Sequence, residues 1–202
     1  VIYRAFGQSF SKEDKRLLNV PFAQFVKLNT EFRHLWNMDK NNKIASRVAL
    51  GALFAYGNAT IAPYSEQFYV GGANSIRAFT VRSIGPGGYH PTGTFRFEAN
   101  VEYRFRIFKS FWGATFLDAG NVWLMRKDEA RPNSQLELKT FPKQIALGTG
   151  VGIRYDMDIL VFRLDFGIPL HLPYDTERSG YYNVTGSFMK NLGIHFAIGY
   201  PF

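Results

Sequence analysis

The sequence predicts an all-β chain that forms part of a transmembrane antiparallel β-barrel, and three observations predict it. Apolar and polar residues alternate with period two along seven segments, which is the pattern of strands with two unlike faces. Helical spacing at i, i+3 and i+4 fits none of these segments. The connections are alternately short and long, as in barrels with tight turns on one side of the membrane and long loops on the other.

The alternation also gives the limits of each strand and connection. The seven segments are 22–36, 44–57, 94–107, 111–124, 145–156, 160–168 and 192–202. A stretch at 2–10 is a candidate for the end of an eighth strand. The connections cover 37–43, 58–93, 108–110, 125–144, 157–159 and 171–191. Their order places the end of the last segment on the side of the short turns, which is the periplasmic side in such barrels.

The first two segments each have one apolar face. In 22–36 the even positions are mostly apolar: Phe22, Val26, Leu28, Phe32 and Trp36. The odd positions of that segment are polar or charged: Lys27, Asn29, Glu31 and Arg33. In 44–57 four large side chains share one face: Val48, Leu50, Phe54 and Tyr56. Arg47 and small residues occupy the opposite face.

The third segment has the clearest division of all. Its odd positions are apolar: Phe95, Phe97, Ala99, Val101, Tyr103, Phe105 and Ile107. Its even positions are polar: Arg96, Glu98, Asn100, Glu102, Arg104 and Arg106. The fourth segment, 111–124, is less cleanly divided and carries Asp118 as an isolated acid.

The last three segments repeat the pattern. In 145–156 one face is apolar: Ile145, Leu147, Val151, Ile153 and Tyr155. In 160–168 apolar residues oppose Arg163 and Asp165, which we expect in a charge network inside the barrel. In 192–202 the apolar face comprises Leu192, Ile194, Phe196, Ile198, Tyr200 and Phe202. The other face is small or polar: Gly193, His195, Ala197, Gly199 and Pro201.

The two faces predict a membrane barrel with an aqueous interior. A face of arginines and glutamates cannot form a dry core, and the opposite apolar face cannot be left in water. A soluble sandwich or a lipocalin-like barrel is the alternative. Long charged side chains and the long 58–93 loop, which has several apolar residues, need more room than eight strands leave. We therefore expect residues 1–202 to be the C-terminal half of a barrel of about sixteen strands, with loop 58–93 folded inside.

Composition excludes several other classes of function. The chain has no cysteine and no apolar stretch long enough for a transmembrane helix. Its net charge is +8, but the basic residues are scattered, which argues against nucleic acid. The four histidines are His34, His90, His171 and His195, and none has a companion at metal-ligand spacing. A lipase-type site with His195 and a loop serine has no nucleophile motif to support it. We expect no enzyme, metal or cofactor.

A distinctive motif lies in the long loop, between Phe68 and Gly87. A glycine pair and a Gly-Pro-Gly segment allow tight bends, and between them Arg77 is flanked by apolar residues. The motif residues are Gly71, Gly72, Ile76, Arg77, Ala78, Phe79, Arg82, Gly85 and Pro86. A phosphate cradle would need a following Lys-Ser or Lys-Thr at a helix start, which this loop lacks.

The motif resembles that of the BamA/TamA superfamily of outer-membrane protein insertases, whose sixth extracellular loop carries Gly-Gly…Val-Arg-Gly-Phe/Tyr. The resemblance continues through Asn100–Phe105, Phe116–Trp123 and Ile198–Phe202, in the family's order. Ala78 stands where the family has glycine, which matters if that position needs a positive φ angle. The amino-acid sequence of the motif is most similar to that of the family's members in the Bacteroidota.

The resemblance implies a buried ionic network and a function. Arg77 would reach into the barrel and pair with Glu102 and Asp118, which hold the loop as an internal strut; alternatively, Glu102 pairs only with Arg104 or another interior arginine. The resemblance also implies periplasmic domains, which would lie outside this chain. The implied function is assembly of β-barrel proteins in the bacterial outer membrane. Its partners would be the lipid bilayer, unfolded outer-membrane β-barrel substrates and periplasmic or lipoprotein accessory subunits. A polypeptide-secretion pore of the same superfamily and a passive porin-like channel are the alternatives.

The last segment suggests a seam in the barrel. Pro201 has no backbone N–H, and Gly193 and Gly199 weaken a strand. In the resembling family the closing strand, here ending in Phe202, is thought to part from the first strand and to expose edges that template an incoming strand. Alternatively, these residues only trim the strand end at the interface.

Overall fold

The structure is a computed structural model that describes residues 16–17, 20–59, 61–88 and 92–202. The candidate strand at 2–10 lies outside the described residues. Seven strands form one sheet: β3 (Gln24–Asn37), β4 (Asn42–Tyr56), β5 (Phe95–Phe108), β6 (Phe111–Trp123), β7 (Ala146–Asp156), β8 (Val161–His171) and β9 (Gly193–Ile198). A short pair, β1 (Arg16–Leu17) and β2 (Val20–Pro21), precedes them. The all-β prediction is confirmed.

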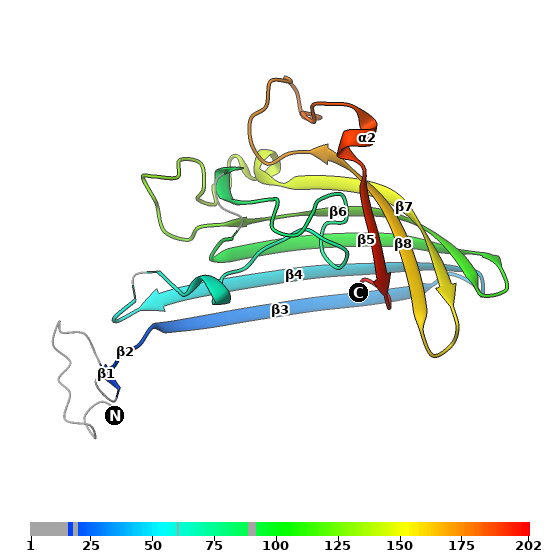
Figure 1. Cartoon of the computed structure of the whole chain (residues 1–202), viewed down its shortest axis with the longest axis horizontal. Helices are drawn as coiled ribbons and strands as arrows, with labels where there is room; N and C mark the ends of the chain where they lie inside the picture. The colour runs from blue at the N-terminus through cyan, green and yellow to red at the C-terminus, as the bar shows by residue number, and fades with distance from the viewer. Residues whose placement is uncertain (1–15, 18–19, 60, 89–91) are drawn as a thin grey trace.

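Each strand of the sheet is antiparallel to the next one in the chain, in the order β3-β4-β5-β6-β7-β8-β9. The sheet is curved like part of a cylinder wall, with β3 at one edge and β9 at the other (Figure 1). The short turns lie at one end of the strands and the long connections at the other (Figure 1). The expected fold class, an open part of an antiparallel barrel, is therefore confirmed, and the total of about sixteen strands stays a prediction.

The long connections contain short helical segments. These are η1 (Tyr64–Glu66), η2 (Pro86–Gly88), η3 (Phe141–Gln144) and α2 (Phe188–Asn191). No helix among the described residues is both long enough and apolar enough to cross a bilayer.

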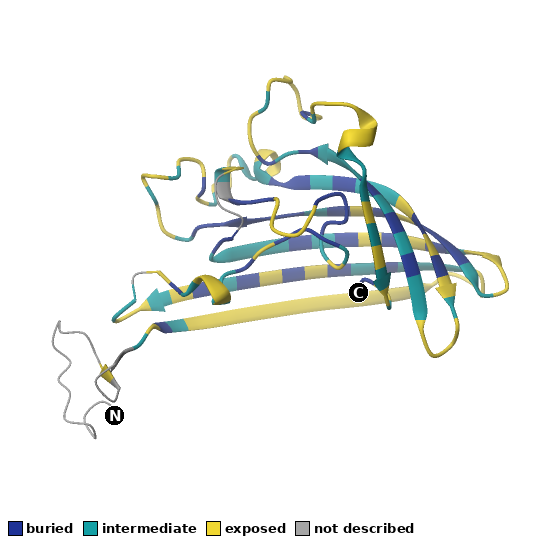
Figure 2. Cartoon of the chain, in the orientation of Figure 1, coloured by how far each residue is buried: buried dark blue, intermediate teal, exposed yellow. Residues whose placement is uncertain are grey.

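Burial alternates along the central strands, as bands along β4 to β8 show in Figure 2. In β5, Val101 and Tyr103 are 48% and 38% exposed, whereas Glu102 between them is fully buried. The predicted faces are thus real: apolar side chains cover the convex side and charged ones the concave side. Strand β3 is exposed over most of its length because it is an edge strand.

The concave side carries a small apolar core built around the 58–93 loop. Loop residues pack there against inward-facing residues of β4, β6 and β7. The buried members are Leu53, Ala62, Phe68, Val70, Ile76, Ala78, Phe79, Ile84, Val122 and Ala146. Two backbone bonds between Phe68 and Gly93 close the base of the loop, at N···O distances of 2.9 and 2.8 Å.

The last strand differs from the prediction. It ends at Ile198 rather than Phe202, because Gly199 has a φ of 90°, which turns the backbone out of the strand direction. The assignment of Phe202 to the outward apolar face is wrong. Pro201 is buried and Phe202 is half-buried. The predicted end of β8 was also too early, since the strand continues from Ile168 to His171.

Candidate functional site: a buried arginine network

Two glycines shape the turn that presents the motif arginine. Gly71 and Gly72 have φ angles of 97° and 93°, a region that side chains disfavour. The Gly71 N–H donates to Ser75 Oγ at 2.9 Å, and the Gly72 N–H donates to the Phe79 carbonyl at 2.8 Å. A β-carbon at Gly71 would lie 2.3 Å from the Thr80 carbonyl oxygen. The turn therefore requires glycine at Gly71 both because of its positive φ and because a β-carbon has no room there.

Arg77 leaves this turn and is fully buried against β5 and β6. Its Nε and Nη2 donate to the two carboxylate oxygens of Asp118, each at 2.8 Å. Its backbone N–H donates to Asp118 Oδ2 at 3.0 Å, and its Nη1 donates to Glu102 Oε2. The ring of Phe116 lies 3.6 Å from the guanidinium carbon. Bidentate, charge-assisted bonds of this kind are the strong class of protein hydrogen bond.

Glu102 also pairs with two further arginines. Arg104 Nε donates to Glu102 Oε1 at 2.6 Å, and Arg154 Nη2 donates to Glu102 Oε2 at 3.0 Å. Both pairings considered for Glu102, with the loop arginine and with Arg104, are therefore present. Burial disfavours the charged form of Arg77, but its hydrogen bond to Asp118 and the charges of Asp118 and Glu102 outweigh burial and raise its pKa. Arg77 is a permanent cation.

The network extends through β7 and β8. Arg154 Nη1 lies 2.6 Å from Asp165 Oδ1, and Arg163 Nη1 lies 3.3 Å from Asp165 Oδ2. Arg163 also donates to the Ala73 carbonyl at 2.8 Å and to the side chain of Asn74. Four strands, β5 to β8, and the loop thus share one ionic network. Arg154 and Arg163 both pair with Asp165 on β8, and Arg163 also connects the sheet to Asn74 of the loop.

Three glycines let the motif backbone lie flat against the last strands. A β-carbon at Gly148 in β7 would lie 2.3 Å from the Ala78 β-carbon, and one at Gly167 in β8 would lie 2.6 Å from the Arg77 carbonyl oxygen. At Gly193 in β9 the corresponding distance to the Arg77 oxygen would be 3.2 Å. The loop motif therefore contacts the sheet as far as its last strand.

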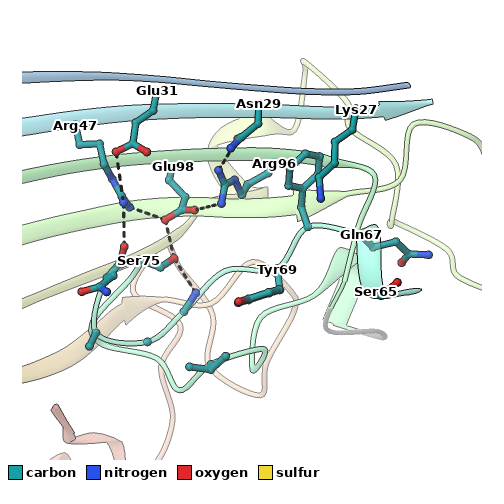
Figure 3. Close-up of a pocket in the computed structure, with 16 residues that line it drawn as sticks. Lys27, Asn29, Glu31, Arg47, Ser65, Gln67, Tyr69, Ser75, Arg96 and Glu98 are labelled. Carbon is teal, nitrogen blue, oxygen red and sulfur yellow. Dashed lines mark hydrogen bonds and ion pairs between the residues drawn. The ribbon is translucent and has the colours of Figure 1, made fainter. Parts of the chain in front are cut away.

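A second set of contacts surrounds a polar cavity of about 550 Å³ on the concave side of β3, β4 and β5. Arg47 Nη2 donates to Glu98 Oε2 at 2.8 Å, and Ser75 Oγ donates to the same oxygen at 2.6 Å (Figure 3). Arg96 lies between Asn29, to which it donates at 2.8 Å, and Glu98, at 3.2 Å (Figure 3). This cavity lies between the loop and the inner face of the first strands.

The remaining motif residues do not join the network. Ala78 is absent from the positions with positive φ, so alanine fits there without backbone strain. Ile76 and Phe79 pack in the apolar core. Arg82 is exposed, has a φ of 61° and places its guanidinium carbon 4.7 Å from the Tyr69 ring. Gly85 is buried, and Pro86 begins η2.

The end of the chain reaches the network from the other side. After the turn at Gly199, whose N–H donates to the Val161 carbonyl at 2.7 Å, the chain enters the concave side. The Phe202 ring centroid lies 5.4 Å from the guanidinium carbon of Arg47 and 5.8 Å from that of Arg77. The Tyr200 ring lies 4.2 Å from that of Arg104. Of the predicted seam residues, Gly193 and Phe202 therefore touch the loop motif or its network.

Several network residues were not singled out from the sequence. They are Arg47, Glu98, Asn100, Phe116 and Arg154. The alternation places four of them on the polar face of a strand but does not show that they join the network; Phe116 has no such signal. Among the described residues, no group of three His, Cys, Asp or Glu side chains is placed to hold a metal ion.

Comparisons with known proteins agree with this architecture. The Omp85 superfamily domain matches residues 20–202. Over 176 residues the chain is 27% identical to the outer membrane protein assembly factor BamA of Nitratidesulfovibrio vulgaris, covering 85% of this chain and 20% of that protein. The chain thus spans about a fifth of that relative's length.

Two solved structures share the fold. One is the crystal structure of BamA from Haemophilus ducreyi lacking POTRA domains 1–3, with a TM-score of 0.62 and 15% identity over 87% of this chain and 34% of that one. The other is CdiB from Acinetobacter baumannii, with a TM-score of 0.51 and 16% identity over 87% of this chain and 27% of that one. The expected lineage within the Bacteroidota stays a prediction. The chain belongs to the Omp85 superfamily and is part of a bacterial outer-membrane β-barrel.

Proposed function

We propose that this chain is part of the barrel of an assembly factor that helps β-barrel proteins to fold and insert into the outer membrane. The observation that carries the proposal is the anchoring of the loop: Arg77 is fully buried and holds Asp118 and Glu102 on two adjacent strands. The match to a protein named as an outer membrane protein assembly factor supports it. The proposed activity uses binding and strand pairing and needs no catalytic group or cofactor.

The anchored loop would act as an internal strut beside a weak edge. Strand β9 has six residues, and only Phe162–Gly167 of the longer β8 pair with it. Its outward side chains Ile194, Phe196 and Ile198 are 60–69% exposed, as expected of a lipid-facing strand. An edge with free N–H and C=O groups can template an incoming strand. We infer that β9 is one side of the seam at which substrates enter the bilayer.

The proposal is tested with the full-length protein reconstituted in lipid vesicles. An unfolded outer-membrane barrel is added, and its folding is followed by the change in gel mobility of the unheated sample. We expect the protein to accelerate folding of the added barrel. A disulfide between β9 and the first strand of the complete barrel should abolish this acceleration, and reduction of the disulfide should restore it. A disulfide between the adjacent strands β5 and β6, away from the seam, is the matched control. Unimpaired assembly by the seam-locked protein would reject the seam.

A polypeptide-secretion pore is the second candidate, and the polar cavity favours it. Lys27, Asn29, Glu31, Arg47 and Arg96 line one side of it with charged or polar groups, beside Phe68, Tyr69 and Val81, so a polar chain could pass along that side. The two functions differ in outcome: a secretion pore would move an exported polypeptide into the vesicle lumen or across a membrane, whereas an assembly factor would leave a folded barrel in the bilayer. A passive porin-like channel would show steady ion conductance without either substrate.

A further inference from the structure

A notch interrupts the wall of the sheet at the end that carries the long connections. Strand β4 continues to Tyr56, but its pairing with β5 stops at Ala52 and Phe95. The Leu53 N–H still donates to the Thr94 carbonyl at 2.8 Å, and beyond it the chain of β5 has turned inward to pair Gly93 with Phe68. Among the described residues, no strand therefore lies beside the last residues of β4 on the side of β5.

A cavity of about 530 Å³ occupies this notch. Its floor is apolar and comes from β4, the start of the long loop and the residues after β6: Leu53, Phe54, Ala55, Ile61, Ala62, Leu124 and Met125. Its size lies within the range of small-molecule sites, roughly 300–1,000 Å³. Phe54 and Ile61 are 52% and 64% exposed. Phe54 continues the outward row of Val48 and Leu50, so the cavity opens beside the lipid-facing surface.

The rim of the cavity is charged and comes from the connection after β6. It contains Arg126, Lys127, Asp128, Glu129 and Arg131. Arg131 and Asp128 form an ion pair at 2.6 Å and so compensate each other. Arg126 Nη2 donates to the Ala55 carbonyl at 2.9 Å, which places its guanidinium across the notch. Lys127 is exposed and makes no hydrogen bond or ion pair with the described residues. Glu129 is an exposed acid on the same rim, so the three cations outnumber the two carboxylates by one, and Arg126 and Lys127 are adjacent in the sequence beside an apolar floor.

We propose that this notch binds an anionic, phosphate-bearing lipid of the outer leaflet, with an acyl chain against Phe54 and Ile61 and the phosphate at Arg126 and Lys127. The membrane orientation follows from the proposed outer-membrane topology, in which the long connections face outward. At that depth the anionic group available beside an acyl chain is the lipid phosphate, and basic residues next to apolar surface bind such headgroups. An apolar floor alone would take any amphiphile, and the cations select an anionic one.

The test uses the full-length protein, delipidated in a mild detergent, and native mass spectrometry of its lipid adducts. Phosphatidylglycerol and phosphatidylcholine with the same acyl chains are added separately. The anionic lipid should be retained in a one-to-one complex more strongly than the zwitterionic one. Inorganic phosphate should not displace it, because phosphate alone makes no contact with the apolar floor. Equal retention of the two lipids, or displacement by inorganic phosphate, would overturn the proposal.

Variants locate the site. Lys127→Gln should weaken retention of phosphatidylglycerol about fivefold, and Ile61→Asn should weaken retention of both lipids. A double variant, Lys139→Gln with Lys190→Gln, removes exposed cations outside the notch and should retain lipid as the parent does. Heat-modified gel mobility checks that each variant is folded. If Lys127→Gln retains phosphatidylglycerol as strongly as the parent does, the lipid does not bind at this notch. No substrate barrel is present in this measurement, so a failure here is distinct from a failure of the assembly assay.

Discussion

Arg77 and Asp118 are forty-one positions apart in the sequence and share three hydrogen bonds, two from the guanidinium and one from the Arg77 backbone N–H. Both side chains are fully buried. The backbone bond matters because it fixes the loop itself and not only its side chain. Asn100 Nδ2 donates to Asp118 Oδ1 at 2.8 Å, so the carboxylate gathers donors from the loop and from β5. Asp118 on β6 therefore anchors the loop to the sheet.

Removal of the loop cation should destabilise the barrel. In Arg77→Ala, Asp118 keeps Asn100 and a backbone N–H as donors, and both are uncharged. Breaking one side of a buried ion pair costs about 3–5 kcal/mol. We expect a lower temperature of heat-modified mobility in the full-length protein and slower substrate assembly. Arg77→Lys should recover part of the stability, because it keeps the charge but cannot engage both oxygens. A parental melting temperature in Arg77→Ala would count against the strut.

The coupling of the two residues can be measured by a double-mutant cycle. If the pair acts as a unit, Arg77→Ala with Asp118→Ala should cost less than the sum of the two single changes, by about 0.5–3 kcal/mol. The double change removes both charges, whereas each single change leaves one charge buried without its partner. A control cycle of Arg77 with exposed Asp158 should be additive. Additivity in the Arg77–Asp118 cycle would show that the two residues act independently.

The strands were predictable because each central strand separates a lipid-facing row from a charged row. In β5 that division is complete, and the predicted range 94–107 differs from Phe95–Phe108 by one residue at each end. The end of β9 was not predictable in the same way. The alternation continues through Tyr200 and Phe202, and only Gly199 and Pro201 signal an earlier end; the alternation does not show that Gly199 has a positive φ.

The network was only partly predictable, for a related reason. The alternation shows which side chains point inward, and Arg154 and Asp165 both lie on that face. It does not show which inward residues meet, because pairing across strands depends on register. Asp118 could be singled out because it is an isolated acid among apolar residues. The contact of Arg77 with Phe116, at 3.6 Å from its ring, leaves no trace in the sequence pattern.

Alanine at position 78 should be the better residue for this protein. Because Ala78 has no positive φ, glycine there relieves no strain and only adds freedom to the unfolded chain. Ala78→Gly should lower the free energy of unfolding by about 0.5–1 kcal/mol, plus the loss of a small buried contact with the apolar core. Thermal denaturation of the parent and the variant in the same detergent measures the difference. A more stable glycine variant would show that the family's glycine meets a conformational need in this chain as well.

A side chain added at one of the sheet glycines that contact the loop motif, such as Gly148, should push the motif away from the sheet. A β-carbon at Gly148 would lie 2.3 Å from that of Ala78, so Gly148→Val should cost about 1–3 kcal/mol from overpacking. Val151→Ile enlarges a residue that is 56% exposed on the opposite face of the same strand and serves as the control. Protease digestion within 58–93 reports whether the loop is displaced. Equal protection of the loop in the two variants would contradict the close packing.

Phe202 should contribute to the network rather than to the lipid-facing surface. Its ring lies within 6.0 Å of the guanidinium carbons of Arg47, Arg77 and Arg104, and each cation–π contact is worth about 0.5–2 kcal/mol. Phe202→Leu keeps an apolar side chain but removes the ring's negative face, so it should lower the melting temperature of the purified barrel. The same change combined with Arg77→Ala should cost less than the sum of the two. Phe196→Leu, on the outward face of β9 and 69% exposed, should have little effect; if it costs as much as Phe202→Leu, the ring acts by apolar contact alone.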